Sequence, residues 1–166
     1  MPKSNEMFNI TQDEVKSFLK SYVASYEKGD AKSFFDAFTD DASIFAVSTP
    51  TRIDGVEEFR HGFEPNLTDG RARRSQILSP EIKTFGPSAI VTYHNRIAVA
   101  DQTTNLRATL VLTKTEAGIR IVHMHNSPLS SVGLPDTRGA GRYGLQEATL
   151  LEERVATAAA AVGTPR

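Results

Sequence analysis

Hydrophobic residues recur at helical spacing in the first part of the chain. Thr11 and Glu14 stand three residues apart, the spacing of a capping box at the start of a helix. Apolar side chains then follow at intervals of three and four, as on one face of an amphipathic helix. We predict one long helix that ends at Gly29. Its apolar positions are Val15, Phe18, Leu19, Tyr22, Val23 and Tyr26.

Two shorter helices and one short strand are predicted next. Asp30 can cap a second helix that carries three phenylalanines, and Asp54-Gly55 leads into a third helix that Pro65 closes. Between these helices, Asp40-Asp41 marks a turn before a strand at residues 43–47. The aromatic positions of both helices are most simply core.

From residue 73 onward, the pattern changes to runs rich in β-branched and aromatic residues. These runs predict strands at residues 73–84, 89–100, 106–114 and 119–126. Pro80 lies inside the first run, which places it at a bulge or on an edge strand. Helices come first and consecutive strands follow, so we expect an α+β domain with an antiparallel sheet.

The stretch that contains the last predicted strand, residues 118–127, reads G-I-R-I-V-H-M-H-N-S. Because side chains alternate with period two, Ile121, His123 and His125 should share one face. Two imidazoles would then lie side by side just before Pro128 ends the strand. If that face lines a pocket, this strand carries the site.

The composition changes after residue 128. Residues 129–144 are rich in Ser, Pro and Gly and read as a linker. Residues 145–166 hold an alanine-rich helix whose narrow apolar stripe should dock on its own domain or on a neighbouring subunit. We therefore expect a domain at residues 1–128, a linker and a C-terminal helix. The stripe consists of Leu151, Val155, Ala158 and Val162.

Charge and composition limit the partners. A formal net charge of -1 favours neither nucleic acid nor an acidic membrane as partner. The chain has no cysteine, which excludes disulfides and a thiol nucleophile. No apolar run approaches the roughly 20 residues that span a bilayer, and no signal peptide is evident. We expect a cytoplasmic protein.

Several short motifs carry a family resemblance across residues 11–128. With them, the chain resembles the nuclear transport factor 2-like, cystatin-type superfamily, and within it the association (hub) domain of calcium/calmodulin-dependent kinase II and its free-standing bacterial relatives. The resemblance implies a cone, in which a curved sheet wraps around the long helix and leaves a pocket. It also implies self-association, as in hub rings, or isomerase, dehydratase or cyclase activity. The motifs are K-G-D at residues 28–30, I-D-G at 53–55, Q-I-L-S-P at 76–80, A-I-V-T-Y at 89–93 and I-V-H-M-H-N-S at 121–127.

Three positions depart from those relatives. Asn95 and Leu110 stand where hub domains carry pocket arginines, although Arg96 and Arg107 lie nearby. Ala46 stands where ketosteroid isomerases carry their general-base aspartate. An anionic-ligand pocket and steroid isomerisation as those relatives perform them are therefore not expected.

The candidate site combines phenols and imidazoles. His123 is a possible general base and Tyr22, which matches the oxyanion-binding tyrosine of the isomerases, a possible donor to a forming enolate. We expect neither metal nor cofactor, because a His-x-His pair still needs a third ligand. The histidines could instead simply hold the sheet in place by hydrogen bonds. The expected ligand-binding residues are Tyr26, Phe45, His94, Arg107 and His125.

Three functions remain open at this stage. The first is a self-associating domain, a homo-oligomer, that binds a small organic ligand between the first helix and the sheet. The second is a cofactor-free isomerase, dehydratase or polyketide-cyclase-like enzyme with a histidine base. The third is a structural hub with an unused pocket.

Overall fold

The computed structural model describes residues 8–129. The predicted C-terminal helix, and all of the predicted linker except its first residue, lie outside the described residues. The helices are α1 (Gln12–Lys28), α2 (Ala31–Asp36) and α3 (Val56–Leu67). The strands are β1 (Phe38–Phe45), β2 (Ile53–Asp54), β3 (Arg73–Phe85), β4 (Ser88–Val99), β5 (Gln102–Thr115) and β6 (Gly118–Pro128).

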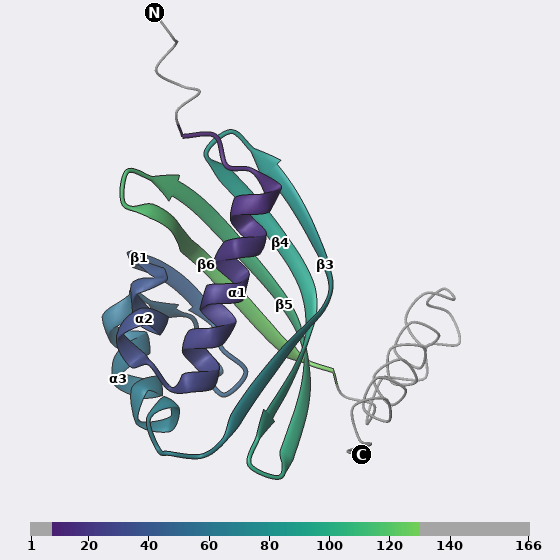
Figure 1. Ribbon diagram of the computed structural model, residues 1–166. Coiled ribbons are helices and arrows are strands. Elements are labelled where there is room, and N and C mark those ends of the chain that lie inside the picture. The colour runs from purple at the N-terminus through teal and green to yellow at the C-terminus, as the bar shows by residue number, and fades with distance from the viewer. Residues whose placement is uncertain (1–7, 130–166) are drawn as a thin grey trace, which may run out of the picture. The chain divides into compact units, whose positions relative to one another are not determined.

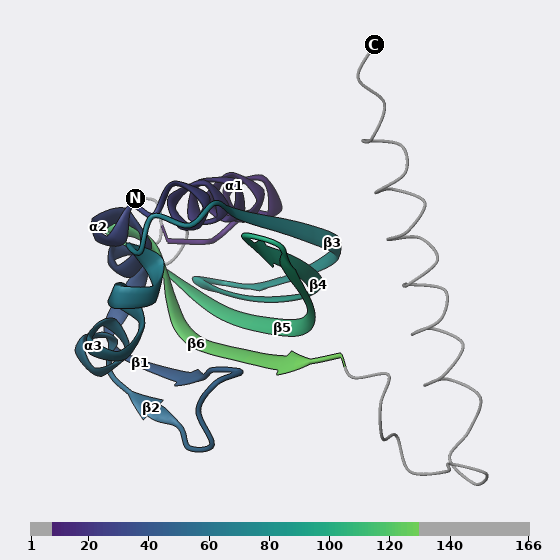
Figure 2. The ribbon, with the colours of Figure 1, turned by 90° about the horizontal axis from the view of Figure 1, so that it is seen from below.

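One curved sheet holds all six strands in the order β2-β1-β6-β5-β4-β3. The four long strands β3 to β6 pair antiparallel as neighbours along the chain, as predicted, whereas β1 pairs with β6 in parallel. The sheet curls around α1, which lies along its concave side (Figures 1 and 2). The predicted α+β class, with a curved sheet around a long first helix, is confirmed, and the sheet is mixed and unclosed.

The start of α1 follows the predicted capping box. The Thr11 hydroxyl accepts a hydrogen bond from the Glu14 backbone N–H at 3.2 Å, and the Glu14 carboxylate accepts one from the Thr11 backbone N–H at 2.9 Å. These two bonds satisfy amides that a helix start leaves free. At the other end, Gly29 adopts φ 65°, where its backbone N–H closes the helix.

Several boundaries differ from the prediction, among them the start of the first strand and the end of the third helix. The first strand begins at Phe38, so Asp40 and Asp41 lie inside β1 rather than in a turn. The third helix runs through Pro65 to Leu67. Pro65 is near the helix end, where the missing N–H removes only one backbone bond, and Leu67 is fully buried. Burial of Leu67 therefore favours one more turn.

Pro80 lies where the prediction placed it. The pairing of β3 with β4 shifts between Leu78 and Glu81, so a β-bulge surrounds this proline. In addition, β3 is the last strand of the sheet, and an edge strand tolerates a residue without an N–H.

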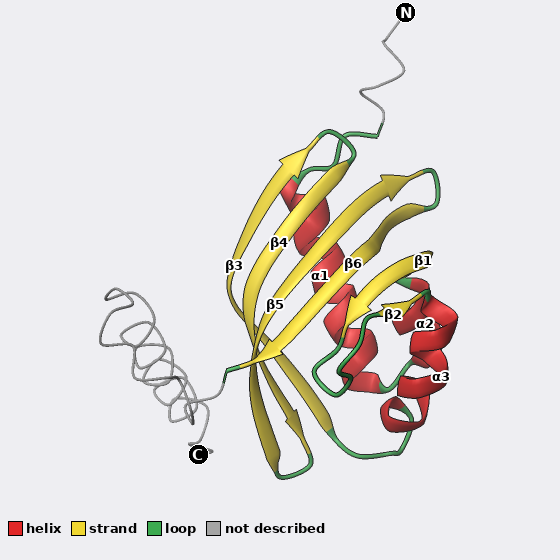
Figure 3. Ribbon diagram, turned by 180° about the vertical axis from the view of Figure 1, so that it is seen from behind, coloured by secondary structure: helices red, strands yellow, loops and turns green. Residues whose placement is uncertain are grey.

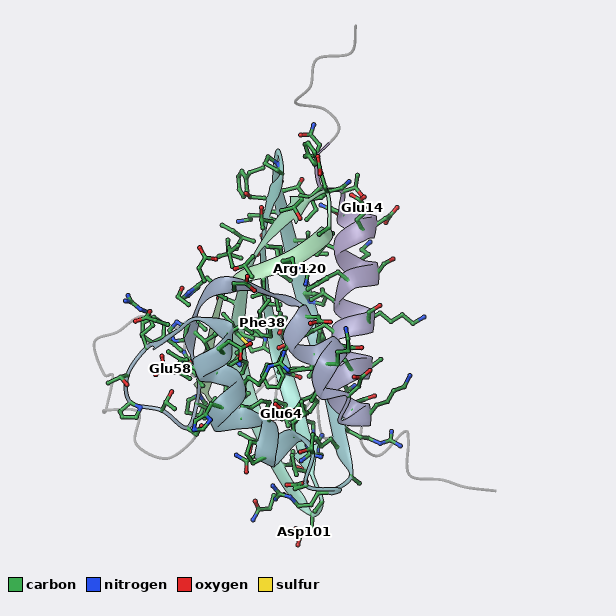
Figure 4. All side chains as sticks on the ribbon, turned by 90° about the vertical axis from the view of Figure 1, so that its left-hand side faces the viewer. Glu14, Phe38, Glu58, Glu64, Asp101 and Arg120 are labelled. Carbon is green, nitrogen blue, oxygen red and sulfur yellow. The ribbon has the colours of Figure 1, made fainter. Side chains whose placement is uncertain are left out.

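The concave face changes from core to cavity along the strands. Near the start of α1, Val15 and Leu19 pack against Val91 and Leu112, which are fully buried on β4 and β5. The far end of the sheet, where Asp101 joins β4 to β5, lies opposite the Glu14 end of the molecule (Figure 4). Between α1 and the long strands, buried side chains therefore fill the end near Glu14, and space remains toward the other end.

Candidate functional site

A cavity of about 520 Å³ lies on the concave side of the sheet. It is lined by the second half of α1, by α3, by the segment that follows β1 and by strands β3 to β6. Most of its wall is apolar or aromatic, as in pockets that bind small organic molecules. The apolar and aromatic lining consists of Tyr22, Val23, Tyr26, Phe34, Ala46, Val47, Ile53, Phe59, Phe63, Ile77, Tyr93, Ile97, Val99, Leu106 and Met124.

Tyr22 of α1 reaches across this cavity toward the sheet. Its hydroxyl donates to the sulfur of Met124 on β6 at 3.6 Å, and its ring stacks on Phe34 with 5.2 Å between centroids. Burial raises the pKa of the Tyr22 hydroxyl well above its usual value, and the nearby phenols of Tyr93 and Tyr26 raise it further. Tyr22 is therefore held as a neutral hydrogen-bond donor.

Tyr26 lies one turn further on, beside a charged cluster at the cavity wall. Burial raises the pKa of the Tyr26 hydroxyl, whereas Arg73 and Arg71 oppose this increase. Asp69 links both arginines, accepting from the Arg73 guanidinium at 2.6 Å and from the Arg71 guanidinium at 2.6 Å. Arg73 also donates to the backbone carbonyls of Arg71 and Asn66. Arg73 is thus held by three acceptors, whereas Arg71 contacts Asp69 through Nε and stays half exposed.

Asp69 remains ionised across the ordinary pH range. The Arg71 backbone N–H, followed by the Arg73 guanidinium, lowers the pKa of this carboxyl group far below its usual value. The cluster of Asp69, Arg71 and Arg73 consequently joins the α3–β3 connection to the cavity wall as a fixed ion-pair network.

Three polar side chains of the sheet face the same cavity. Tyr93 and Asn95 are two residues apart on β4, and Asn126 lies on β6, where Ala108 of β5 pairs with both Tyr93 and Asn126. Tyr93 is only 6% exposed, and burial raises the pKa of its hydroxyl. The Ser75 hydroxyl donates to the Asn95 side-chain oxygen at 3.0 Å. Sequence reasoning did not select Tyr93, Asn95 or Asn126 as site residues.

The lining contains no carboxylate and no imidazole among the residues that the structure describes. Its ionisable members are the three tyrosines and the two paired arginines. A cavity of this kind offers hydrogen-bond donors but no side chain that could act as a proton acceptor near neutral pH.

The two histidines of β6 lie on the opposite face of the sheet. Leu112 pairs with Ile121 while Val111 pairs with His123, so Val122 is an extra residue at a β-bulge. Up to Ile121 the odd positions face the core, and beyond the bulge the even positions Met124 and Asn126 do so. The expectation that Ile121 and His123 share a face is therefore wrong, because one inserted residue reverses the alternation.

On the convex face, His123 and His125 form a small cluster with β1. The Phe45 ring lies 5.9 Å from the His123 ring and 5.3 Å from the His125 ring, measured between centroids. The Ser43 hydroxyl and Nδ1 of His123 share a hydrogen bond of 2.7 Å. Phe45 is 39% exposed and points away from the cavity.

His94 and Arg107 also lie outside the cavity. They pair across β4 and β5, one residue out of phase with the cavity-lining Tyr93 and Leu106. Nδ1 of His94 is buried and has no hydrogen-bond partner among residues 8–129. Of the predicted site residues, the structure therefore brings Tyr22 and Tyr26 together at the cavity. It separates from them Phe45, His94, Arg107, His123 and His125.

The catalytic pair proposed from the sequence is not assembled. Tyr22 lies on the concave side and His123 on the convex side, so the sheet separates the expected donor from the expected base. Within the described residues, no three His, Asp or Glu side chains gather closely enough to hold a metal ion. None of the described helices is both long and apolar enough to cross a membrane.

The sequence does contain a pattern that indicates Tyr93 and Asn95 as cavity residues. Ala89, Val91 and Tyr93 alternate along β4 toward Asn95, and this alternation continues the buried face. The same alternation places His94, which was expected to bind the ligand, on the other face. The bulge at Val122, by contrast, has no glycine or proline to announce it.

Solved structures with the same fold share low sequence identity with this chain. A candidate dehydratase of the NTF2-like family from Streptomyces avermitilis has a TM-score of 0.66 at 16% identity, over 72% of this chain and 96% of its own. The CaMKII hub of S. rosetta has a TM-score of 0.61 at 22% identity, over 70% and 95% of the two chains.

A third solved structure, an NTF2-like superfamily protein from Salmonella enterica serovar Typhimurium, has a TM-score of 0.62 at 21% identity, over 78% of this chain and 96% of its own. Likeness at such low identity shows a common fold and leaves the function open. No curated protein matches the sequence significantly. The model of the SnoaL-like domain family matches residues 15–131, and the chain therefore belongs to this family of NTF2-like domains.

Proposed function

We propose that this domain binds a small, mainly apolar organic molecule in the cavity between α1 and the sheet. The observation that carries the proposal is the cavity itself: about 520 Å³, walled mostly by aromatic and aliphatic side chains. This volume lies within the range of about 300 to 1,000 Å³ that is usual for ligand pockets.

Binding fits the cavity better than proton-transfer catalysis. An isomerase or dehydratase that works by removing a proton needs a base within hydrogen-bond reach of its substrate. The described lining holds no carboxylate or imidazole, and the phenols of Tyr22 and Tyr93 have raised pKa values that keep them protonated. The candidate enzymes among the structural neighbours therefore share the fold of this chain, but its described cavity lining has no side chain that could act as their general base.

A neutral fluorescent probe tests the proposal directly. N-phenylnaphthylamine is dim in water and bright in apolar surroundings, so it should brighten on binding to the full chain. Gly62 of α3 lines the cavity, and a Cβ added there would meet no atom within 4 Å. Gly62→Phe should therefore place a ring at the cavity wall and weaken binding of the probe about tenfold or more.

The matched control is His61→Phe. His61 is the preceding residue on the same helix, is exposed and does not line the cavity. This variant should bind the probe as the wild type does. Equal binding by the wild type and Gly62→Phe, or no binding by the wild type, would count against the pocket.

A second proposed property is self-association through the convex face of the sheet. No described helix covers β4, β5 and β6 on that side (Figure 3). Phe45 and Ile90 are 39% and 38% exposed there, so this face offers apolar side chains to a partner. One structural neighbour is a hub and another is named an association domain, and a second copy of this chain is the partner we favour.

A further inference from the structure

Tyr93 and Asn95 form a polar patch in the wall of the cavity. Both project from the concave face of β4, and two residues of a strand span about 6.6 Å. Polar groups placed sparsely in an apolar pocket fix the orientation and identity of a ligand. The patch therefore shows which chemical group the pocket can accept.

The side-chain amide of Asn95 is oriented by its neighbour. Because the Ser75 hydroxyl donates to its oxygen at 3.0 Å, the amide nitrogen is the end left free. Ser75 is itself fixed, since its backbone N–H donates to the Glu27 carboxylate at 2.9 Å. The two N–H donors of Asn95 have no other partner within residues 8–129 and border the cavity.

The Tyr93 hydroxyl supplies a second donor. Tyr93 is 6% exposed, and its hydroxyl has no hydrogen-bond partner among the described residues. Because Tyr93 lines the cavity, a ligand in the cavity that accepts a hydrogen bond from this hydroxyl gains that interaction. Tyr93 and Asn95 thus offer two donors on the same face of β4 to a ligand in the cavity.

A carbonyl oxygen matches this arrangement because it can accept two hydrogen bonds. An ionised carboxylate matches it less well. The lining cations Arg71 and Arg73 both contact Asp69, and neither belongs to the patch of Tyr93 and Asn95, where a charge would be buried without a counter-ion. We propose that the pocket is selective for neutral carbonyl compounds with an apolar body, whose oxygen accepts hydrogen bonds from Asn95 and Tyr93.

This inference rests on the proposed binding function, and matched ligands separate the two. Acetylnaphthalene carries a ketone, and ethylnaphthalene has a similar shape without the oxygen. The full chain should bind the ketone about tenfold more tightly than the hydrocarbon, as expected for two neutral hydrogen bonds. Isothermal titration with both ligands measures this preference.

Substitutions show which side chains cause the preference for the ketone over the hydrocarbon. Asn95→Leu should reduce it to about twofold and leave binding of ethylnaphthalene nearly unchanged. Tyr93→Phe keeps the ring and removes only the hydroxyl, so it should fold normally and reduce the preference about threefold. The control is Thr92→Leu, on the same strand but on the exposed convex face, which should keep the full preference.

Three results would overturn the inference. Equal affinities of the wild type for ketone and hydrocarbon would refute carbonyl selectivity while the pocket itself stood. A naphthoate that bound more tightly than the ketone, with no effect of Asn95→Leu, would assign the pocket to anions instead. Binding of no naphthalene derivative would refute the proposed function, and the inference with it.

Discussion

At the scale of single residues, burial decides the chemistry of the cavity. Tyr22, Tyr26 and Tyr93 all have raised pKa values, and desolvation is the first cause for each. A phenol that stays protonated donates a hydrogen bond but cannot remove a proton. These three hydroxyls are therefore hydrogen-bond donors in a mainly apolar cavity wall.

The raised pKa values predict a loss of stability in alkali. A group with a higher pKa in the folded state stabilises that state below its ordinary value, which is about 10 for tyrosine. As the pH rises further, this stability is lost. We expect Tyr22, Tyr26 and Tyr93 to form phenolate only as the protein unfolds, which ultraviolet absorbance and circular dichroism can follow together.

The fourth tyrosine, Tyr143, lies outside the described residues. The variant Tyr143→Phe removes its contribution to the ultraviolet absorbance. If the other tyrosines ionised near their ordinary pKa while the circular dichroism stayed constant, the account of their burial would be wrong.

Side-chain alternation made some residues predictable and concealed others. Tyr22 and Tyr26 were found because their spacing of four fixes a common helix face. His123 and His125 were placed on the wrong face because the bulge at Val122 has no local sequence signature. Reading a strand from one end carries such an error to every residue beyond the bulge.

At the scale of elements, the capping residues predicted the ends of α1 more reliably than the local sequence predicted the start of β1. The capping box of Thr11 and Glu14 and the left-handed Gly29 set both ends of α1, as the sequence predicted. The start of β1 could not be predicted, because its parallel pairing with β6 is a contact between distant residues. Local sequence carries little information about such pairing.

Two glycines of the helical region predict opposite effects of the same substitution. Gly29 has φ 65°, and an added Cβ would lie 2.9 Å from the Leu67 carbonyl oxygen. Gly29→Ala should therefore destabilise the protein by about 2 kcal/mol. Gly62 lies inside α3 with open space around it, so Gly62→Ala should stabilise the protein by about 0.5 to 1 kcal/mol.

Urea unfolding of both variants beside the wild type measures these changes as shifts in midpoint. The same direction of shift for both variants would contradict the assigned conformations.

At the scale of the whole molecule, the two faces of the sheet have different roles. The concave face carries the core at one end and the cavity at the other, whereas the convex face carries exposed apolar and histidine side chains. The resemblance predicted the fold, and the SnoaL-like family match supports it. It did not predict the face on which each polar residue lies, because family motifs fix the order of elements rather than each strand's register.

Self-association through the convex face predicts the effect of one substitution there. Phe45→Glu replaces an exposed ring with a charge, which should be tolerated in the monomer but disfavoured in an interface. Sedimentation at micromolar concentration should show an oligomer for the wild type and a folded monomer for the variant.

Glu81→Gln, on the exposed part of the edge strand β3, is a suitable control and should remain oligomeric. A monomeric wild type, or an oligomer that Phe45→Glu leaves intact, would refute this interface. Loss of the oligomer on removal of residues 130–166, with Phe45→Glu still assembled, would assign the contact to the C-terminal segment instead.

The measurement that most directly tests the central claim is a backbone amide NMR titration of the full chain with acetylnaphthalene. We predict that the largest shifts cluster at cavity residues, among them Tyr22, Tyr93, Asn95 and Asn126. Signals of the convex-face residues His94 and Arg107 should move less than these. Shifts centred on the convex face, or no saturable shifts at all, would contradict a ligand pocket between α1 and the sheet.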